Sequence, residues 1–175
     1  GLIFPNISHI FYSELIEYLE IELFKHGYKA IICNSQNNPD KERDYLEMLE
    51  ANQVDGIISS SHNLGIDDYE KVSAPIIAFD RNLAPNIPIV SSDNFEGGRM
   101  AAKLLKKHGC QHPIMIAGKD NSNSPTGLRQ LGFKSVFAQA PIFHLSGELS
   151  IIRKEMEIKV ILQNEKPDGI FLSDD

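Results

Sequence analysis

The chain has 175 residues and is acidic, with 24 Asp and Glu against 17 Lys and Arg and a formal net charge of −7. This balance argues against nucleic-acid binding by these residues themselves, because phosphate binding requires clustered Lys and Arg. Hydrophobic residues make up 42% of the chain without any long apolar run, which excludes a membrane span and indicates a globular protein of one compact domain or two small lobes.

In the first part of the chain, short apolar runs alternate with helical periodicity, the pattern of parallel strands joined by crossover helices. Gly27 and Gly109 are expected to end helices, and Asn38 to cap one. The predicted strands are residues 1–4, 28–33, 55–60, 75–79 and 113–117, and the predicted helices are 11–26, one starting at 38–40, a weak one at 66–72, and 95–108 capped by Ser92 or Asp93.

The turn-rich stretch at 118–125 interrupts this alternation and is the predicted domain boundary. We therefore expect an N-terminal lobe at 1–118, an interlobe crossing at 119–125 and a partial C-terminal lobe at 126–175. The second lobe is predicted to contain helices at 126–138 and 148–164 and strands at 142–145 and 168–172. A second lobe of only two strands would have an unpaired sheet edge, so further sequence is expected beyond Asp175. The predicted fold class is α/β, with two doubly wound parallel-sheet lobes.

No motif in the chain indicates catalysis or a cofactor. Dinucleotide and Walker phosphate loops, an HExxH helix and a GxSxG elbow are all absent from the sequence, so we expect no enzyme, no cofactor and no metal site. Cys33 and Cys110 have neither CxxC nor metal spacing, and reduced buried thiols in a reducing compartment are expected. The pair Gly97-Gly98 inside a predicted helix is more typical of close packing than of a ligand loop.

Polar and aromatic residues follow each of the first four predicted strands. They lie at 6–11, 34–37, 59–63 and 80–81. Because ligands of parallel sheets gather at the carboxyl ends of the strands, Asp80 and Arg81 are candidate binding residues. The alternative is a surface ion pair that contributes little.

Six segments resemble, in order and spacing, the effector-binding domain of the lactose and galactose repressor family. These are PNISHIFYSELIEYLE, NSQNNPDKERDYLEML, VDGIISS, IIAFDR, SSDNFEGGRMAAKLL and LRQLGF. The resemblance covers nearly all of the chain and implies the fold of periplasmic ribose-type sugar receptors. It further implies a cytoplasmic, homodimeric bacterial repressor with no membrane part, which binds a small effector, usually a sugar, in an interlobe cleft. Operator DNA would be bound by a helix-turn-helix that is not in this chain.

The resemblance also implies ligand-binding residues in the first lobe. Phe11 and Tyr12 occupy the places of an aromatic pair that flanks the ligand, and such rings stack on the C–H faces of sugars. Phe11 could instead pack simply as part of its helix stripe. Asp80 and Arg81 match an Asp-Arg pair whose side chains bind sugar hydroxyl and ring oxygens. Purine-responsive members tend to place Trp after the Asp, so Arg81 favours a sugar.

Two further ligand-binding residues are implied in the second lobe. Arg129 matches the arginine of an Arg-x-x-Gly-Phe motif that reaches the ligand, although a solvated helix arginine is the simpler alternative. Asp174 takes the place of a turn residue, often Asn, that hydrogen-bonds the sugar, and its alternative is an exposed chain end.

We therefore expect a sugar-responsive transcriptional repressor core. An extracytoplasmic sugar receptor of a transporter is the alternative, a purine-responsive repressor is a further one, and an enzyme on a similar scaffold is disfavoured. The sequence leaves open which sugar binds, whether it induces or corepresses, the operator, the oligomeric state, and whether residues are missing between Phe133 and Ile142.

Overall fold

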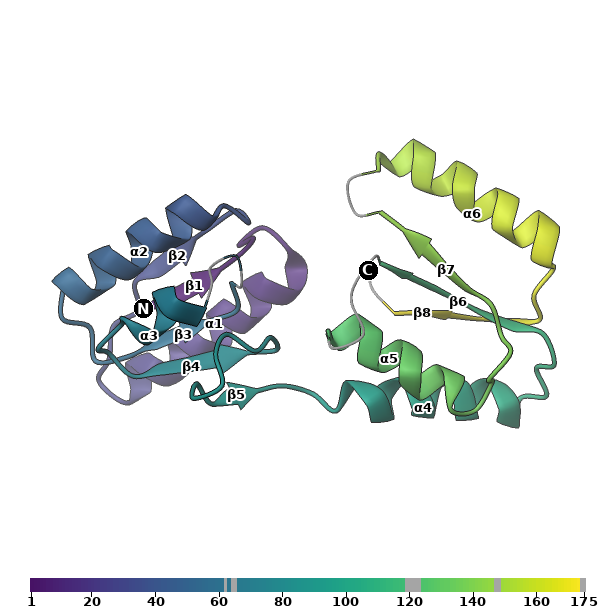
Figure 1. Cartoon of the computed structure of the whole chain (residues 1–175), viewed down its shortest axis with the longest axis horizontal. Helices are drawn as coiled ribbons and strands as arrows, with labels where there is room; N and C mark the ends of the chain where they lie inside the picture. The colour runs from purple at the N-terminus through teal and green to yellow at the C-terminus, as the bar shows by residue number, and fades with distance from the viewer. Residues whose placement is uncertain (62, 64–65, 119–123, 147–148, 174–175) are drawn as a thin grey trace. The chain divides into compact units, whose positions relative to one another are not determined.

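The computed structural model describes residues 1–61, 63, 66–118, 124–146 and 149–173 (Figure 1). The chain divides into two compact units, Gly1–Ser91 and Ser92–Asp175. This division lies earlier than the boundary expected at 119–125, of which residues 119–123 are outside the described part. The reason is strand pairing, because the strand at 113–118 bonds to the two strands at 142–145 and 169–172, which follow it in the chain.

The first unit contains a five-stranded sheet in the order β2-β1-β3-β4-β5, and every neighbouring pair is parallel. This order confirms the predicted doubly wound α/β architecture. Its elements are β1 (Leu2–Phe4), α1 (Ile10–Lys25), β2 (Ile32–Asn34), α2 (Pro39–Ala51), β3 (Ile57–Ser59), α3 (Ile66–Glu70), β4 (Ile76–Phe79) and β5 (Ile89–Val90). Strand β5 was not predicted, because it has only two residues and both are exposed.

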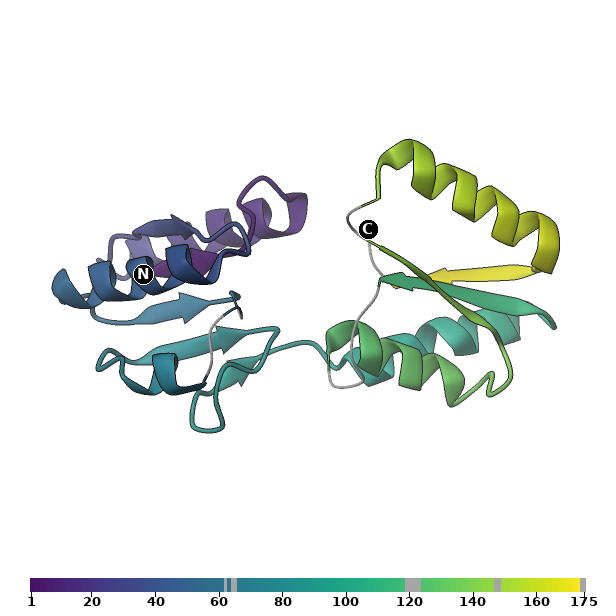
Figure 2. The same cartoon turned by 45° about the horizontal axis from the view of Figure 1, so that its top comes forward.

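Alternate residues of β1 build two separate cores, one on each face of this sheet. Leu2 and Phe4 pack with Ile16 of α1, whereas Ile3 packs with Leu46 and other residues of the opposite face. Successive side chains of a strand point to opposite faces, so a short, fully buried strand needs a helix on each side. Figures 1 and 2 show α1 on one face and α2 on the other.

The second unit contains a three-stranded parallel sheet in the order β7-β6-β8. Helices α4 and α5 cover one face and α6 lies across the other (Figure 2). The core under α4 and α5 contains Ala102, Met115 and Phe133, whereas α6 has no buried residue among those described. The elements are α4 (Asn94–Lys107), β6 (Pro113–Gly118), α5 (Pro125–Lys134), β7 (Ile142–Leu145), α6 (Ile151–Glu165) and β8 (Gly169–Leu172).

The helix ends predicted from capping residues and glycines are confirmed. The Asn38 side chain accepts from the backbone N–H groups of Asp40 and Lys41, and Asp93 accepts from that of Glu96. Gly27 and Gly109 adopt φ of 82° and 83°, which glycine reaches without a Cβ penalty.

Helices α4 and α5 meet through two glycines that leave no room for a side chain. A Cβ on Gly98 would overlap the carbonyl oxygen of Arg129, and a Cβ on Gly132 would overlap that of Phe95. Gly97 faces open space. The expected close-packing role is therefore confirmed for Gly98 and not for Gly97.

Within the described ranges, no helix is long and apolar enough to cross a membrane, and no group of three or more His, Cys, Asp or Glu is placed to hold a metal ion. Both cysteines are free: Cys33 is buried and Cys110 is half-buried. Burial raises the pKa of the Cys33 thiol above its ordinary value.

Substituting the helix glycines tests this contact. Gly98→Ala and Gly132→Ala should each destabilise the protein by about 2 kcal/mol or more, since overpacking a tight contact forces backbone shifts. Gly97→Ala is the matched control and should stabilise it by up to about 1 kcal/mol, the helix preference of Ala over Gly. Urea unfolding measures all three, and equal stability of Gly97→Ala and Gly98→Ala would contradict the close contact.

Candidate functional site

An aromatic cluster forms at the carboxyl ends of β1 and β4 in the first unit. Phe11 and Tyr12 lie in the first turn of α1, with ring centroids 5.2 Å apart, and the Phe11 ring lies 6.0 Å from that of Phe79, the last residue of β4. Phe11 remains 47% exposed, so it is not a core residue of its helix. The Ser60 hydroxyl donates to the Tyr12 hydroxyl at 3.4 Å, which joins the end of β3 to the cluster.

Asp80 and Arg81 follow Phe79 in a tight turn. Asp80 has φ of 62°, and the Arg81 backbone N–H bonds the Phe79 carbonyl oxygen at 2.8 Å, which closes a three-residue turn around Asp80. Such a turn costs a non-glycine residue on the order of 1–3 kcal/mol, and Asp and Asn bear it best. Both side chains are half-buried. The turn therefore places residues 80 and 81 directly after Phe79, whose ring lies near that of Phe11.

A buried carboxylate accepts hydrogen bonds from residues at the same edge of the sheet. Glu42 of α2 is fully buried. It accepts hydrogen bonds from the Ser61 hydroxyl at 2.7 Å, from the Asn63 side-chain amide at 2.9 Å and from the Tyr69 hydroxyl. The Ser61 hydroxyl in turn lies 2.6 Å from that of Ser35, next to the end of β2. We call Ser35, Glu42, Ser61, Asn63 and Tyr69 the Glu42 network.

Tyr69 shows the electrostatic effect of this network. Burial, and then the hydrogen bond to the Glu42 carboxylate, raise the pKa of Tyr69 above its ordinary value. The phenol therefore stays protonated and continues to donate at any pH in which the protein is used. Its oxygen also lies 3.0 Å from the Ser61 carbonyl oxygen, so α3 is tied to the residues that follow β3.

Sequence reasoning missed the Glu42 network, although a signal for it was present. Glu42, Leu46 and Leu49 share one helical stripe, and all three are buried. An acid at a core position of an amphipathic helix indicates a buried carboxylate with donors around it. The run Ser59-Ser60-Ser61, after a buried strand, supplies such donors.

In the second unit, Arg129 of α5 is held at the carboxyl edge of the sheet. Its Nε donates to Asn94 Oδ1 at 2.9 Å, and its Nη1 donates to the Ser173 carbonyl oxygen, just after β8, at 2.8 Å. Arg129 is half-buried and Asn94 is 5% exposed, so this arginine is not a freely solvated helix residue. The glycine contact described above sets the α4–α5 distance that allows the Asn94 bond.

The structure thus groups the candidate residues by unit. Phe11, Tyr12, Asp80 and Arg81 share one edge of the first sheet, and Arg129 lies at the corresponding edge of the second. Asp174 is outside the described residues.

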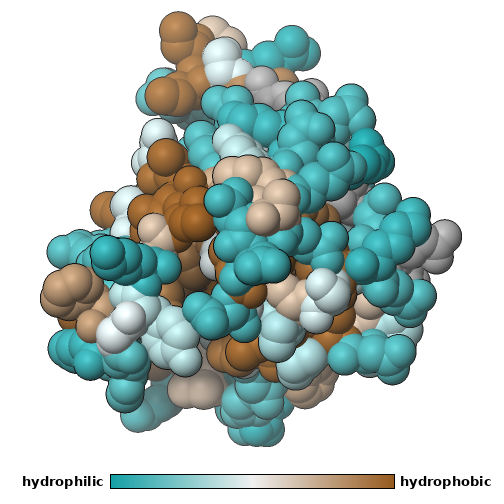
Figure 3. All heavy atoms as spheres, turned by 90° about the vertical axis from the view of Figure 1, so that its left-hand side faces the viewer, coloured by the Kyte–Doolittle hydropathy of each residue, from teal (hydrophilic) through white to brown (hydrophobic). Residues whose placement is uncertain are grey.

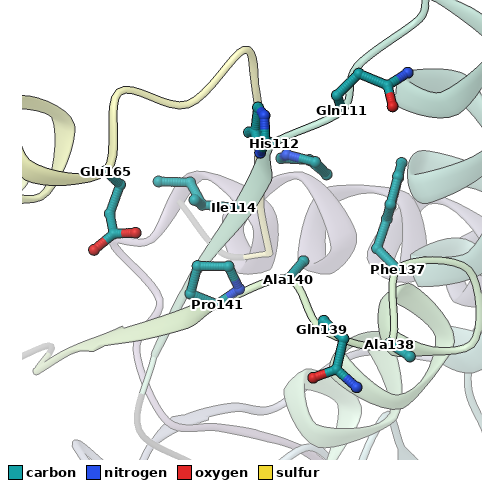
Figure 4. Close-up of a pocket in the computed structure, with 10 residues that line it drawn as sticks. Gln111, His112, Ile114, Phe137, Ala138, Gln139, Ala140, Pro141 and Glu165 are labelled. Carbon is teal, nitrogen blue, oxygen red and sulfur yellow. The ribbon is translucent and has the colours of Figure 1, made fainter.

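Hollows elsewhere on the two units involve none of these candidates. One of about 460 Å³, at the amino ends of β6 and β7, is lined by residues such as His112, Phe137 and Glu165 (Figure 4). Another of about 270 Å³, at the amino ends of the first sheet, is lined by Leu2, Tyr28 and others. Figure 3 shows hydrophobic side chains gathered among hydrophilic ones on the left-hand side of Figure 1.

Comparison with curated proteins finds close relatives among sugar operon repressors. The chain is 48% identical to the sucrose operon repressor of Lactococcus lactis subsp. lactis over 179 residues, covering all of this chain and 56% of the relative. It is equally identical, at 48%, to the sucrose operon repressor of Pediococcus pentosaceus, covering 55% of that protein. The chain therefore spans about half the length of the curated relatives it matches.

Solved structures and a family model agree with these relatives. A periplasmic binding protein/LacI transcriptional regulator from Alkaliphilus metalliredigens, complexed with D-xylulofuranose, superposes with a TM-score of 0.80 at 31% identity, over 98% of this chain and 65% of that one. The family model for periplasmic binding proteins and the sugar binding domain of the LacI family matches residues 1–158. The match covers the first α/β unit and the second as far as residue 158, and it confirms the resemblance seen in the sequence. The chain belongs to this family of periplasmic binding proteins and LacI-type sugar-binding domains.

Proposed function

We propose that the chain is the effector-binding part of a sugar-responsive bacterial transcriptional repressor, and that it controls an operon for sucrose use. The relatives that are 48% identical are sucrose operon repressors, and they cover every residue of this chain. The observation that carries the ligand assignment is the aromatic cluster beside the Asp80–Arg81 turn.

The chemistry of this edge fits a sugar. The exposed Phe11 ring offers an apolar face for sugar C–H groups. The Asp80 carboxylate and the Arg81 guanidinium, in the turn after Phe79, would offer an acceptor and a fork of donors for hydroxyl groups. We propose Phe11, Tyr12, Asp80, Arg81 and Arg129 as ligand-binding residues, with Asp174 as a further one. Catalysis and a cofactor have no part in this function.

We further propose that the sugar contains a ketofuranose ring. The relative at 31% identity is complexed with D-xylulofuranose, a ketofuranose, and sucrose carries its fructose unit in the same ring form.

We propose that operator DNA is bound outside these 175 residues, in the cytoplasm and by a homodimer. The net charge of −7 supports a separate DNA-binding segment, because phosphates repel an acidic surface. The sugar would act by stabilising one of two conformations, and its differential affinity for them limits the change in DNA affinity.

A thermal-shift screen tests the ligand. Sucrose, D-fructose or D-xylulose should raise Tm, since a ligand at 100 times its Kd stabilises the folded state by about 2.7 kcal/mol. D-glucose, D-ribose and guanine should have smaller effects. Arg81→Ala should abolish the shift while the unliganded variant stays folded, and Arg153→Ala, whose side chain is 71% exposed, is the control. A normal shift in Arg81→Ala would remove Arg81 from the site.

Operator binding tests the regulatory role. The intact protein should bind DNA from the promoter region upstream of its own operon, and the active sugar should change the Kd by about 5- to 150-fold. Fluorescence anisotropy with labelled DNA measures both values, and the direction of change distinguishes an inducer from a corepressor. A protein that binds the sugar but no such DNA would instead be a sugar receptor.

A further inference from the structure

We infer that Glu42 is a positioning residue for the ligand site: its buried carboxylate holds the end of β3 so that Ser60 meets Tyr12. This inference deepens the proposed function and rests on it for its ligand-binding part. Glu42 itself touches neither the aromatic cluster nor the Asp80–Arg81 turn in any described contact. It would act through the residues between them.

Two adjacent residues, Ser61 and Ser60, connect the Glu42 carboxylate to the aromatic cluster. Glu42 accepts from the Ser61 hydroxyl at 2.7 Å, and Ser60, the neighbour of Ser61, donates to the Tyr12 hydroxyl. The Ser60 backbone N–H also bonds the Ile3 carbonyl oxygen at 3.0 Å. A shift of Ser61 would therefore move Ser60 away from Tyr12, because adjacent backbone atoms cannot move independently.

Glu42 also connects three neighbouring strands. The Ser35 hydroxyl contacts that of Ser61, and the Ser35 backbone N–H bonds the Phe4 carbonyl oxygen at 2.9 Å. The ends of β2, β1 and β3 are thus joined through Ser35 and Ser61, and the Ser61 hydroxyl donates to the Glu42 carboxylate. Strand pairing ends at Asn34, Phe4 and Ser59, and the next residues, Ser35 and Ser60, still bond to β1 through their backbone N–H groups. Ser61 makes its described bonds to Ser35 and Glu42 through its side chain.

An apolar residue at position 42 would fill the same core space without accepting hydrogen bonds. Leu46 and Leu49 occupy the same stripe, and a leucine at 42 would extend it at no cost of burying a charge. A buried carboxylate is instead directional, since each donor must point at one of its two oxygens. Directionality matters where a binding surface has to be held in place, which is the situation at the end of β3.

Glu42→Gln tests the role because it keeps the side-chain size and removes the charge. The amide has one acceptor oxygen in place of two, so it cannot accept both from Ser61 and Asn63, which share Oε2, and from Tyr69, which donates to Oε1. Calorimetric titration with sucrose, D-fructose and D-xylulose should show Kd for the active sugar raised at least tenfold, at a temperature where the variant is folded. Glu47→Gln, at an exposed position of the same helix, should bind as the wild type does.

Hydrogen exchange gives a readout that needs no ligand. In Glu42→Gln, the amides of residues 57–61 should exchange faster relative to those of β1 and β4 than in the wild type. Tyr69→Phe should lower Tm with little effect on Kd, because Glu42 keeps its bonds to Ser61 and Asn63. If Glu42→Gln fails to fold, Ser61→Ala, which removes the same link from the other side, should show the weakened binding and the faster exchange.

The outcomes separate the two proposals. A Glu42→Gln variant with lower Tm but unchanged Kd and unchanged relative exchange of 57–61 would overturn the positioning role and leave the proposed function standing. A wild type that binds none of the three sugars would contradict the proposed ligand. In that case faster exchange of 57–61 in Glu42→Gln would support the positioning role, and unchanged exchange would overturn it.

Discussion

Parallel pairing of the strands is the constraint on which both units depend. Parallel neighbours must be joined by a crossover, so every strand of a sheet ends at the same edge and every following loop starts there. In the first unit this brings Phe11 next to Phe79 and Tyr12 next to Ser60, from segments that are far apart in sequence. In the second unit it brings α5, which follows β6, to the end of β8. The position of the candidate ligand residues at one edge therefore follows from the backbone pairing of the strands.

The two units hold their carboxyl edges in physically different ways. The first uses a buried carboxylate, which satisfies hydroxyl and amide donors from residues next to β2, β3 and α3. The second uses contact between backbones: Gly98 and Gly132 let α4 approach α5 closely, and this approach lets Asn94 accept from Arg129. The Glu42 network holds residues outside the strands, whereas the glycine contact sets how closely two helices approach.

Local signals predicted most of the fold. Asn38 and Asp93 as caps, and Gly27 and Gly109 as helix ends, were read from single residues, because capping and positive φ depend on chemistry within one turn. Strand β5 was missed because Ile89 and Val90 are too few to show a period. Among the candidate residues, Phe11, Tyr12, Asp80 and Arg81 came from positions after strands together with the family resemblance. Glu42 was missed because acids are ordinarily exposed, and only burial reveals that this one is a core residue.

The sequence by itself determined the α/β alternation, the helix ends and the edge at which polar residues accumulate, since each of these depends on neighbours within a few residues. Tertiary structure decided where the units divide. The turn-rich stretch at 118–125 is a strong local signal, yet β6 pairs with β7 and β8, and α4 packs on α5, so the division falls before Ser92. The tertiary structure also determines that Glu42 is buried and that Arg129 bonds to Asn94 and Ser173. Strand partners and the donors around a buried charge are contributed by residues distant in the chain, and no local pattern specifies which of them will meet.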